Sequence, residues 1–377
     1  MPSLLSVLRP RRLALAAGVL GAISFGLAYQ FALKYRERAG LPHRSPVEGS
    51  PADFGLAFES VEVPSGDGSL AAWFVPAEDS GGRRGSVGPR PAVAIVHGWE
   101  SNRGRSMAHI RYLHAAGFHC LVVDVRGHGD NPPEELPVNV PEFGEAAAAA
   151  ARWLAGRPEV SAVGLLGHSM GGAGAILAGA SEPVVQVVVA LSSPADLVRM
   201  TRKTFEIAEM NIPAPIAAPL AYLTAAVLLV PRRHSIDDAS ACVAAARYRG
   251  PLLLMHGEDD RGVPVAHLGL IADAARGTRT DPGSAPIETL IVPGCGHRWL
   301  YEDAEVRRRT ASFFAAALGG PVAPEKAGEL AAACVVERPE NPVYGFGAAS
   351  AAQKAEAEAR DKARREARTK SDRPPLN

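Results

Sequence analysis

Short apolar runs rich in β-branched residues alternate along most of this chain with segments of helical periodicity, and this alternation restricts the fold more than any other feature. The run "AVAIV" at 92–96 has the near-continuous apolar character of a strand buried on both faces. Strands of this kind, separated by helices, form mostly parallel sheets covered by helices on both faces. The sequence therefore predicts an α/β fold. We expect strands at 92–96, 119–124, 160–166, 184–190, 251–255 and 287–292, and helices at 103–116, 142–155, 170–180, 237–247, 264–275 and 301–317.

A β-hairpin is predicted ahead of the alternating part, because apolar segments at 55–63 and 69–75 flank the turn sequence "PSGDG". In a mostly parallel sheet, functional groups collect just beyond the carboxyl ends of the strands. The expected strand ends here carry His, Asp, Ser and Arg in glycine-containing loops, so we place the candidate site there. These loops are "HGWE" at 97–100, "DVRGHGD" at 124–130, "GHSMGG" at 167–172, "SSPAD" at 192–196, "HGEDDRGVP" at 256–264 and "GCGHRW" at 294–299.

Ser169 lies between an expected strand and an expected helix, in a stretch crowded with glycines. A chain that passes directly from strand to helix holds its central residue in a strained conformation, and glycines two positions to either side avoid collisions. Gly167 and Gly171 occupy those two positions. The turn also places the hydroxyl at a helix N-terminus, which favours developing negative charge. Ser169 is therefore a candidate nucleophile.

A serine nucleophile needs a general base, and the base needs a group that orients it. His297 follows the last expected strand in the glycine-flanked loop "PGCGH" and is the candidate base. The loop "HGEDDRGVP" offers two adjacent carboxylates as the orienting acid. The candidates are Asp259 and Asp260, with Asp196 after the preceding strand as the alternative.

Other polar residues at the strand ends are expected to support loops. His97 and His256 directly end strands, and His168 is adjacent to the serine along the backbone, which places it poorly to accept the serine proton. Asp124 and Arg126 are expected to brace a loop below the site as a pair.

Five motifs, in this order, resemble those of the α/β-hydrolase family of serine hydrolases: "IVHGW", "VVDVRGHGD", "GHSMGG", "HGEDDRGVP" and "GCGH". The resemblance covers residues 55–318 approximately, and it implies hydrolysis through an acyl-enzyme on Ser169. It assigns the acid to Asp260, which begins the pattern D-x-x-V-P. It also implies an oxyanion hole formed by the backbone amides of Trp99 and Met170, and it implies no cofactor.

The reaction that we expect from this resemblance is cleavage of carboxylic esters. The same resemblance includes serine aminopeptidase-like members, so peptide or amide cleavage is the alternative. From a different class, the fold could serve as a non-catalytic binding module at a membrane. The presence of a complete Ser, Asp and His set argues against that role.

The segment Leu13–Leu33 near the N-terminus contains no charged residue. A helix needs about 20 such residues to cross the ~30 Å apolar core of a bilayer. The small residues "GLA" at 26–28 would suit signal-peptide cleavage, but the apolar run continues beyond them, so we favour an uncleaved single-pass anchor. Positive charges in the tail 1–12 and after the span are nearly balanced. Orientation is therefore weakly determined, with an extracytoplasmic domain favoured.

Two further segments flank or interrupt the α/β alternation. Residues 34–53 are rich in Pro, Gly and Ser and are expected to form a linker to a hydrolase domain at 54–320. Residues 195–236 are expected to form an apolar lid over Ser169 that suits an acyl chain. An anchor that holds the domain at a bilayer would bring lipid-like esters within reach. Three prolines in the first half of this lid argue against a straight membrane helix: Pro213, Pro215 and Pro219.

The C-terminal segment 321–377 has helix-forming Ala, Glu, Lys and Arg without an apolar stripe in its final part, and it is predicted to be a solvated helix or a disordered tail. Basic charge is concentrated in this tail and in residues 1–50, although the formal net charge of the chain is +0. That distribution argues against a nucleic-acid partner, which requires Lys and Arg on a folded face. The sequence has no Gly-Lys pair for a P-loop and no H-E-x-x-H for zinc, and its four cysteines form no CxxC motif.

Overall fold

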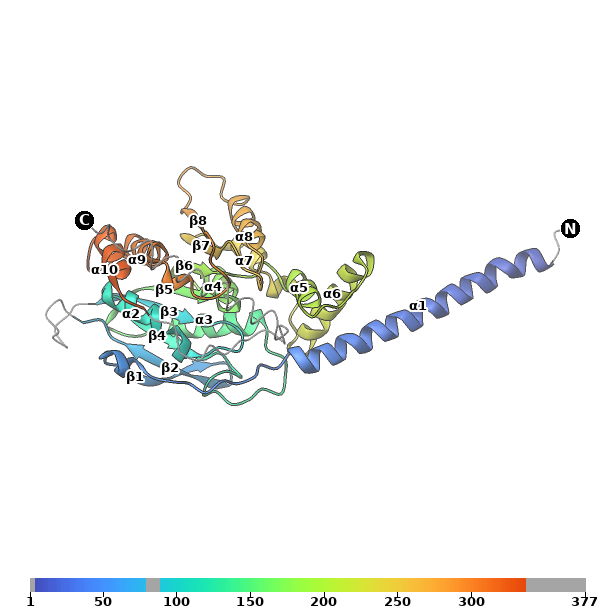
Figure 1. Cartoon of the computed structure of the whole chain (residues 1–377), viewed down its shortest axis with the longest axis horizontal. Helices are drawn as coiled ribbons and strands as arrows, with labels where there is room; N and C mark the ends of the chain where they lie inside the picture. Colours follow the sequence, from blue (N-terminus) through green and yellow to red (C-terminus); the bar gives the residue numbers. More distant parts are fainter. Residues whose placement is uncertain (1–3, 79–88, 337–377) are drawn as a thin grey trace, which may run out of the picture.

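The computed structural model describes residues 4–78 and 89–336, and its centre is one eight-stranded sheet (Figure 1). The strand order is β1-β2-β4-β3-β5-β6-β7-β8. β1 and β2 pair antiparallel as the expected hairpin, β2 is antiparallel to β4, and the other neighbouring strands are parallel. The predicted mostly parallel α/β sheet is therefore confirmed. The strands are β1 (Glu59–Ser65), β2 (Gly68–Val75), β3 (Arg90–Val96), β4 (His119–Val123), β5 (Val160–His168), β6 (Val185–Leu191), β7 (Leu252–Gly257) and β8 (Ile287–Val292).

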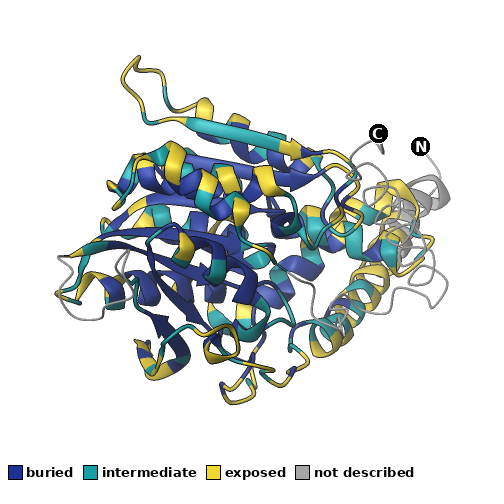
Figure 2. Cartoon of the chain, turned by 60° about the vertical axis from the view of Figure 1, so that its left-hand side comes forward, coloured by how far each residue is buried: buried dark blue, intermediate teal, exposed yellow. Residues whose placement is uncertain are grey.

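Helices cover both faces of this sheet, because alternate side chains of the buried strands point to opposite sides. On β3, Ala92, Ala94 and Val96 belong to the hydrophobic cluster of one face, whereas Val93 and Ile95 belong to that of the other. The central strand β3 is buried beyond its first residue, whereas the edge strand β8 is mostly intermediate in exposure (Figure 2). The helices of the first face are α3 (Val140–Ala155), α4 (Met170–Ser181), α7 (Ala241–Arg247) and α8 (Ala266–Arg276), and those of the second are α2 (Met107–Ala115), α9 (Ala304–Leu318) and α10 (Pro324–Ala333).

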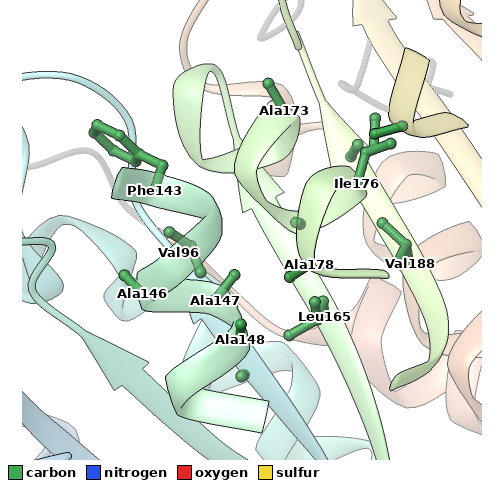
Figure 3. Packing of buried hydrophobic residues seen from close by; sticks show 14 of the residues in the cluster. Val96, Phe143, Ala146, Ala147, Ala148, Leu165, Ala173, Ile176, Ala178 and Val188 are labelled. Atoms are coloured by element: carbon green, nitrogen blue, oxygen red, sulfur yellow. The ribbon is translucent and has the colours of Figure 1, made fainter. Parts of the chain in front are cut away.

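Small side chains allow α3 and α4 to pack closely together above the centre of the sheet. A Cβ on Gly174 of α4 would lie 2.6 Å from the backbone of Phe143 in α3, and Ala147 lies on the side of α3 that is turned toward α4 (Figure 3). Phe143 packs at the first turn of α3. This packing fixes the position of α4, which begins directly after the candidate nucleophile Ser169.

The N-terminal helix α1 (Leu4–Ala39) projects from the domain (Figure 1). Its domain end packs against two helices of the segment between β6 and α7, which are α5 (Leu197–Ile207) and α6 (Ala214–Leu229). Two described helices are long and apolar enough to cross a membrane: Ala17–Ala39, of whose most apolar window 6% is buried, and Ala214–Arg232, of whose window 33% is buried.

The predicted linker at 34–53 differs from the structure. Its first residues continue α1, and the rest lies against the domain instead of forming a free spacer. Asn102 donates from Nδ2 to the carbonyls of Ser45 and Pro46, at 3.1 and 3.0 Å, and Val138 N–H donates to the carbonyl of Gly40 at 2.8 Å. The polar backbone of this Pro- and Gly-rich segment is satisfied by loops of the domain, which periodicity could not reveal.

Two expectations about 195–236 and 321–377 also need correction. The three prolines do not prevent a helix, because Pro213 and Pro215 fall at the N-cap and in the first turn, where N–H groups have no intrahelical partner, and α6 continues through Pro219. Within the predicted C-terminal tail, α10 packs onto the domain, and the guanidinium of Arg307 donates to the carbonyls of Ala331 and Ala332. The remainder of that tail, 337–377, lies outside the described residues.

Candidate active site

Ser169 occupies a sharp turn between β5 and α4. β5 ends at His168 and α4 begins at Met170, so Ser169 alone connects them, with φ 56° and ψ −124°. A Cβ on Gly167 would lie 2.1 Å from the carbonyl oxygen of Gly171, and a Cβ on Gly171 would lie 2.3 Å from two backbone oxygens of the β3 end. Any larger residue at either position would displace backbone, so these glycines are required for the turn, as the sequence predicted.

His297 lies beside the Ser169 hydroxyl, in the connection between β8 and α9. Its Nε2 is 3.0 Å from Ser169 Oγ, and its Nδ1 is 2.7 Å from Asp260 Oδ2. An ionised carboxylate only accepts hydrogen bonds, so Nδ1 carries the proton. The neutral ring then has a lone pair at Nε2, which accepts the serine proton. The tertiary structure therefore brings together the three side chains singled out at three separate strand ends.

The carboxylate of Asp260 is held by two backbone N–H groups and by two histidines. Oδ1 accepts from the N–H groups of Gly262 and Val263, at 2.9 and 2.8 Å, and Oδ2 accepts from His297. Nε2 of His256 lies 3.1 Å from the same Oδ2, but its proton is shared with the closer carbonyl of Val263, at 2.8 Å. Burial by itself raises the pKa of Asp260, but the electrostatic interaction with His297 and the hydrogen bonds from both histidines outweigh it and lower this pKa well below its usual value. The group is therefore held ionised.

The two alternative acids lie elsewhere. Asp259, adjacent in sequence, is exposed, and its N–H donates to the carbonyl of Cys295 at 2.9 Å. Asp196 caps α5 by accepting from Arg199 N–H at 2.8 Å, and it pairs with the Arg199 guanidinium. Geometry favours Asp260 as the partner of the base.

Neighbouring histidines hold the loops around Ser169. His168 Nε2 is 2.7 Å from the carbonyl oxygen of His297, so it must donate its proton there, and burial lowers its pKa to about 3, which keeps it neutral. His97 Nε2 accepts from Val125 N–H at 3.0 Å, and burial lowers its pKa to about 4. Both therefore support backbone.

The expected pair of Asp124 and Arg126 does not form. Asp124 pairs instead with the buried guanidinium of Arg103, while the nearest carboxylate to Arg126 is that of Glu134, at 3.8 Å. Arg103 reaches Asp124 from the loop after β3, which is distant in sequence but adjacent in the sheet. Closeness along the chain, which suggested Arg126 as the partner of Asp124, was therefore misleading.

A pocket of about 900 Å³, including the open space at its mouth, contains Ser169 and His297. A Cβ on Gly98 would lie 3.1 Å from Ser169 Cβ, so the backbone leading to Trp99 runs directly beside the serine. Met170 is the first residue of α4, where the N–H has no intrahelical acceptor. Trp99 lines the pocket, and Met170 follows Ser169 as the first residue of α4, so the assignment of their N–H groups as oxyanion donors stays a prediction.

Several pocket residues escaped the sequence reasoning. Arg298, Trp299 and Tyr301 follow the candidate base directly, and their position in "GHRWLY" was the available signal. Arg105 and His109 come from the loop after β3 and from α2. Within the described part of the chain, none of the pocket-lining residues comes from 195–236, so the lid over Ser169 stays a prediction. The described residues contain no group of three or more His, Cys, Asp or Glu placed to hold a metal ion.

Comparisons with known proteins point to one fold. The model of the family Hydrolase_4, described as serine aminopeptidase, S33, matches residues 88–240. The human protein ABHD12B is 26% identical over 222 residues, which cover 56% of this chain and 56% of that protein, so this chain spans about half of its length. A monoacylglycerol lipase of Mycolicibacterium smegmatis is 26% identical over 244 residues, 57% of this chain and 83% of the lipase. The solved structure of the Pyrococcus furiosus esterase Pf2001 aligns with a TM-score of 0.55 at 20% identity, over 74% of this chain and 100% of that chain.

Proposed function

We propose that this chain, which belongs to the α/β-hydrolase superfamily, is a membrane-anchored serine hydrolase that cleaves carboxylic esters through an acyl-enzyme on Ser169. The observation that carries the proposal is the continuous hydrogen-bonded series from Ser169 Oγ to His297 and on to Asp260, at 3.0 and 2.7 Å. A merely structural serine would not need a neutral imidazole with its lone pair directed at the hydroxyl.

In the proposed mechanism, Ser169 Oγ attacks the carbonyl carbon of the substrate while His297 Nε2 takes the hydroxyl proton. Asp260 keeps the other ring nitrogen protonated and stabilises the imidazolium that forms. The backbone N–H groups of Trp99 and Met170 receive the developing oxyanion, and losing one such donor costs about 3 kcal/mol of transition-state stabilisation. His297 then returns the proton to the leaving alcohol. Water, activated in the same way, releases the acid.

The charges of the pocket favour esters over the amino-terminal substrates of an aminopeptidase. Glu100 is the single carboxylate among the lining residues that the structure describes, and it already accepts from His43, at 2.8 Å from Nδ1. Arg105 and Arg298 line the same pocket. A substrate with a protonated α-amine would therefore find one carboxylate among these described residues, and that carboxylate already accepts from His43.

Membrane anchoring is proposed from α1. Its uncharged run Leu13–Leu33 is long enough to cross a bilayer, and large apolar side chains along it are exposed, among them Leu15 at 70% and Leu27 at 69%. Such a surface is unfavourable in water. An anchored domain would meet ester substrates at the membrane, which supports lipid-like acyl esters as the substrate class. We place the domain on the extracytoplasmic side.

Peptide or amide cleavage is the second candidate, favoured by the family model that matches residues 88–240. One experiment separates these activities. The full chain in detergent, with and without Ser169→Ala, is treated with a fluorophosphonate probe and then offered a panel of acyl esters and aminoacyl amides. We expect labelling that Ser169→Ala abolishes, together with ester turnover.

The other outcomes of this experiment point to the competing functions. Labelling with turnover of amides alone would identify a peptidase. Failure of the wild-type chain to label, in detergent and in lipid, would identify a non-catalytic binding module. A fall in activity as acyl chains lengthen from short to medium would exclude lipid-like esters while leaving the esterase intact.

A further inference from the structure

Helix α6 exposes apolar side chains where a helix on the surface of a water-soluble domain exposes charged ones. Ala221, Thr224 and Ala225 form its buried face. The opposite face is open to the surroundings, with Ile216 54% exposed and Tyr222 57% exposed. We call the exposed apolar residues larger than alanine in this helix and in the turn that follows it the α6 stripe: Pro215, Ile216, Pro219, Tyr222 and Val230.

The neighbouring helix α5 has the opposite character. Its exposed face is charged, with Arg199 and Arg202 among its members, and Glu206 pairs with Arg202 at 3.6 Å. Its buried face presents Phe205, whose ring lies 5.7 Å from that of Phe31 in α1, measured between centroids. We call these two helices, which follow each other in the chain, the α5–α6 hairpin. In this hairpin α5 presents charged side chains to water or headgroups, and α6 presents an apolar surface.

The hairpin projects from the domain at the same place as α1. The guanidinium of Arg232, just after α6, donates to the carbonyl of Pro137 at 2.6 Å, and Gly40, just after α1, accepts from Val138 N–H at 2.8 Å. The carboxyl ends of both helices therefore meet one loop, and their amino ends lead away from it. Figure 1 shows α5 and α6 beside the domain end of α1, on the side from which α1 projects.

The charge pattern of α1 indicates how deep the hairpin would lie relative to a bilayer that α1 spans. The uncharged run of α1 ends at Leu33, and Lys34 begins a basic segment. Phe31 contacts Phe205 of the hairpin, and Ala32 is fully buried against its neighbours. The last turn of the apolar run therefore already packs against the hairpin, so a bilayer that covers this run also reaches the hairpin.

Basic side chains lie on the domain side of this level. Lys34, Arg36 and Arg38 end α1, and the exposed Arg233 follows α6. Such charges next to an apolar surface suit the headgroups of anionic lipids, with each one contributing about 1 kcal/mol near such a surface. Both the charge and the apolar surface thus match a membrane.

We propose that the α5–α6 hairpin is a second membrane contact, in which the α6 stripe lies against the acyl chains of the leaflet nearest the domain while the charged face of α5 lies among headgroups and water. This inference rests on the proposed anchoring by α1. A single spanning helix leaves the tilt of the whole protein relative to the bilayer unrestrained. A second contact beside it fixes one orientation of the domain, and with it of the Ser169 pocket, relative to the membrane surface.

The test places a fluorescent reporter at three positions of the full chain, reconstituted in vesicles of phosphatidylcholine with a minor fraction of phosphatidylglycerol. Cys242 and Cys334, which are partly exposed, are replaced by Ser, and a bimane label is attached after Tyr222→Cys, Arg202→Cys or Val19→Cys in separate variants. Melting temperatures equal to that of the parent chain establish that each variant folds. Quenching by brominated lipid reports acyl-chain contact, and quenching by iodide reports water contact.

For the labels at 222 and 19 we expect that brominated lipid quenches the fluorescence and that iodide does not. For the label at 202 we expect that iodide quenches the fluorescence and that brominated lipid does not. Iodide quenching at 222 as strong as at 202, with lipid quenching retained at 19, would overturn the hairpin contact and leave the anchor standing. Loss of lipid quenching at 19 would instead overturn the anchoring by α1, and the inference with it. Energy transfer between labels at 222 that rises with the ratio of protein to lipid would show that a second copy of this chain covers the stripe, which also overturns the inference.

Discussion

Replacing Asp260 with Asn tests the proposed mechanism at the most deeply buried of the three catalytic side chains. The side chain of Asp260 is fully buried, and its Oδ1 accepts from Gly262 and Val263 N–H, which an amide oxygen reproduces. The amide nitrogen then takes the place of Oδ2, facing the Nδ1–H of His297. Two donors cannot share a hydrogen bond, so the favourable arrangement puts the ring proton on Nε2 and the lone pair on Nδ1. The ring then presents a proton, instead of a lone pair, to Ser169.

The expected loss follows from this change of tautomer. Serine hydrolases whose base is held in the wrong tautomer lose roughly 10⁴-fold in kcat, which corresponds to about 5 kcal/mol of transition-state stabilisation. We expect Asp260→Asn to lower kcat on a short activated ester by that order, with a small change in KM. Fluorophosphonate labelling of Ser169 should slow in parallel, because it uses the same base.

Asp259→Asn is the matched control, since it makes the same chemical change one residue away on an exposed side chain. We expect activity within about twofold of the parent, as is usual for surface substitutions. Near-UV circular dichroism of both variants checks that the fold is retained. The reasoning would be refuted if Asp260→Asn kept activity within tenfold of the parent, or if Asp259→Asn caused the larger loss.

Two further predictions concern the turn and the stability of the fold. Gly171→Ala should lower both the melting temperature and the fraction of chain labelled by fluorophosphonate, because its Cβ would lie 2.3 Å from backbone oxygens. Gly269→Ala is the control, since its Cβ would have no atom within 4 Å, and it should leave both quantities unchanged or improved. Equal behaviour of the two variants would count against the proposed constraint. Acid should destabilise the chain as the pH falls from about 6.5 toward 4, because burial lowers the pKa of His97 and His109 to about 4 and that of His128 to about 3, so unfolded imidazoles bind protons first. At pH 5 each should cost about 2 kcal/mol of unfolding free energy, and urea denaturation curves that coincide at pH 7 and pH 5 would contradict this.

Much of the fold was predictable because its determinants are local. Buried parallel strands need continuous apolar runs, and "AVAIV" at 92–96 and the runs after it marked all six strands of the alternating part to within a few residues. The strained turn at Ser169 needs Gly167 and Gly171, which the sequence displays directly. The chain order of the motifs then indicated which strand ends would supply a base and an acid.

Contacts between segments distant in sequence were the ones that sequence reasoning missed. Arg103 pairs with Asp124 because β3 and β4 are neighbours in the sheet, and no spacing along the chain records this. The predicted linker packs on the domain, and α10 packs on α9, because loops and helices elsewhere supply the hydrogen-bond partners and apolar surface that these segments need.

The sequence by itself determined the α/β architecture, the turn that presents Ser169 and the apolar character of α1, since each depends on residues close together in the chain. The residue types alone left Asp259 and Asp260 as equal candidates, which only the motif resemblance separated. The tertiary structure decides between them physically, because the loop turns Asp260 toward His297 and leaves Asp259 exposed. It also decided that the segment 195–236 forms a hairpin against α1 and contributes no described residue to the pocket lining. An apolar helix must cover its surface with some partner, and sequence alone does not say which one.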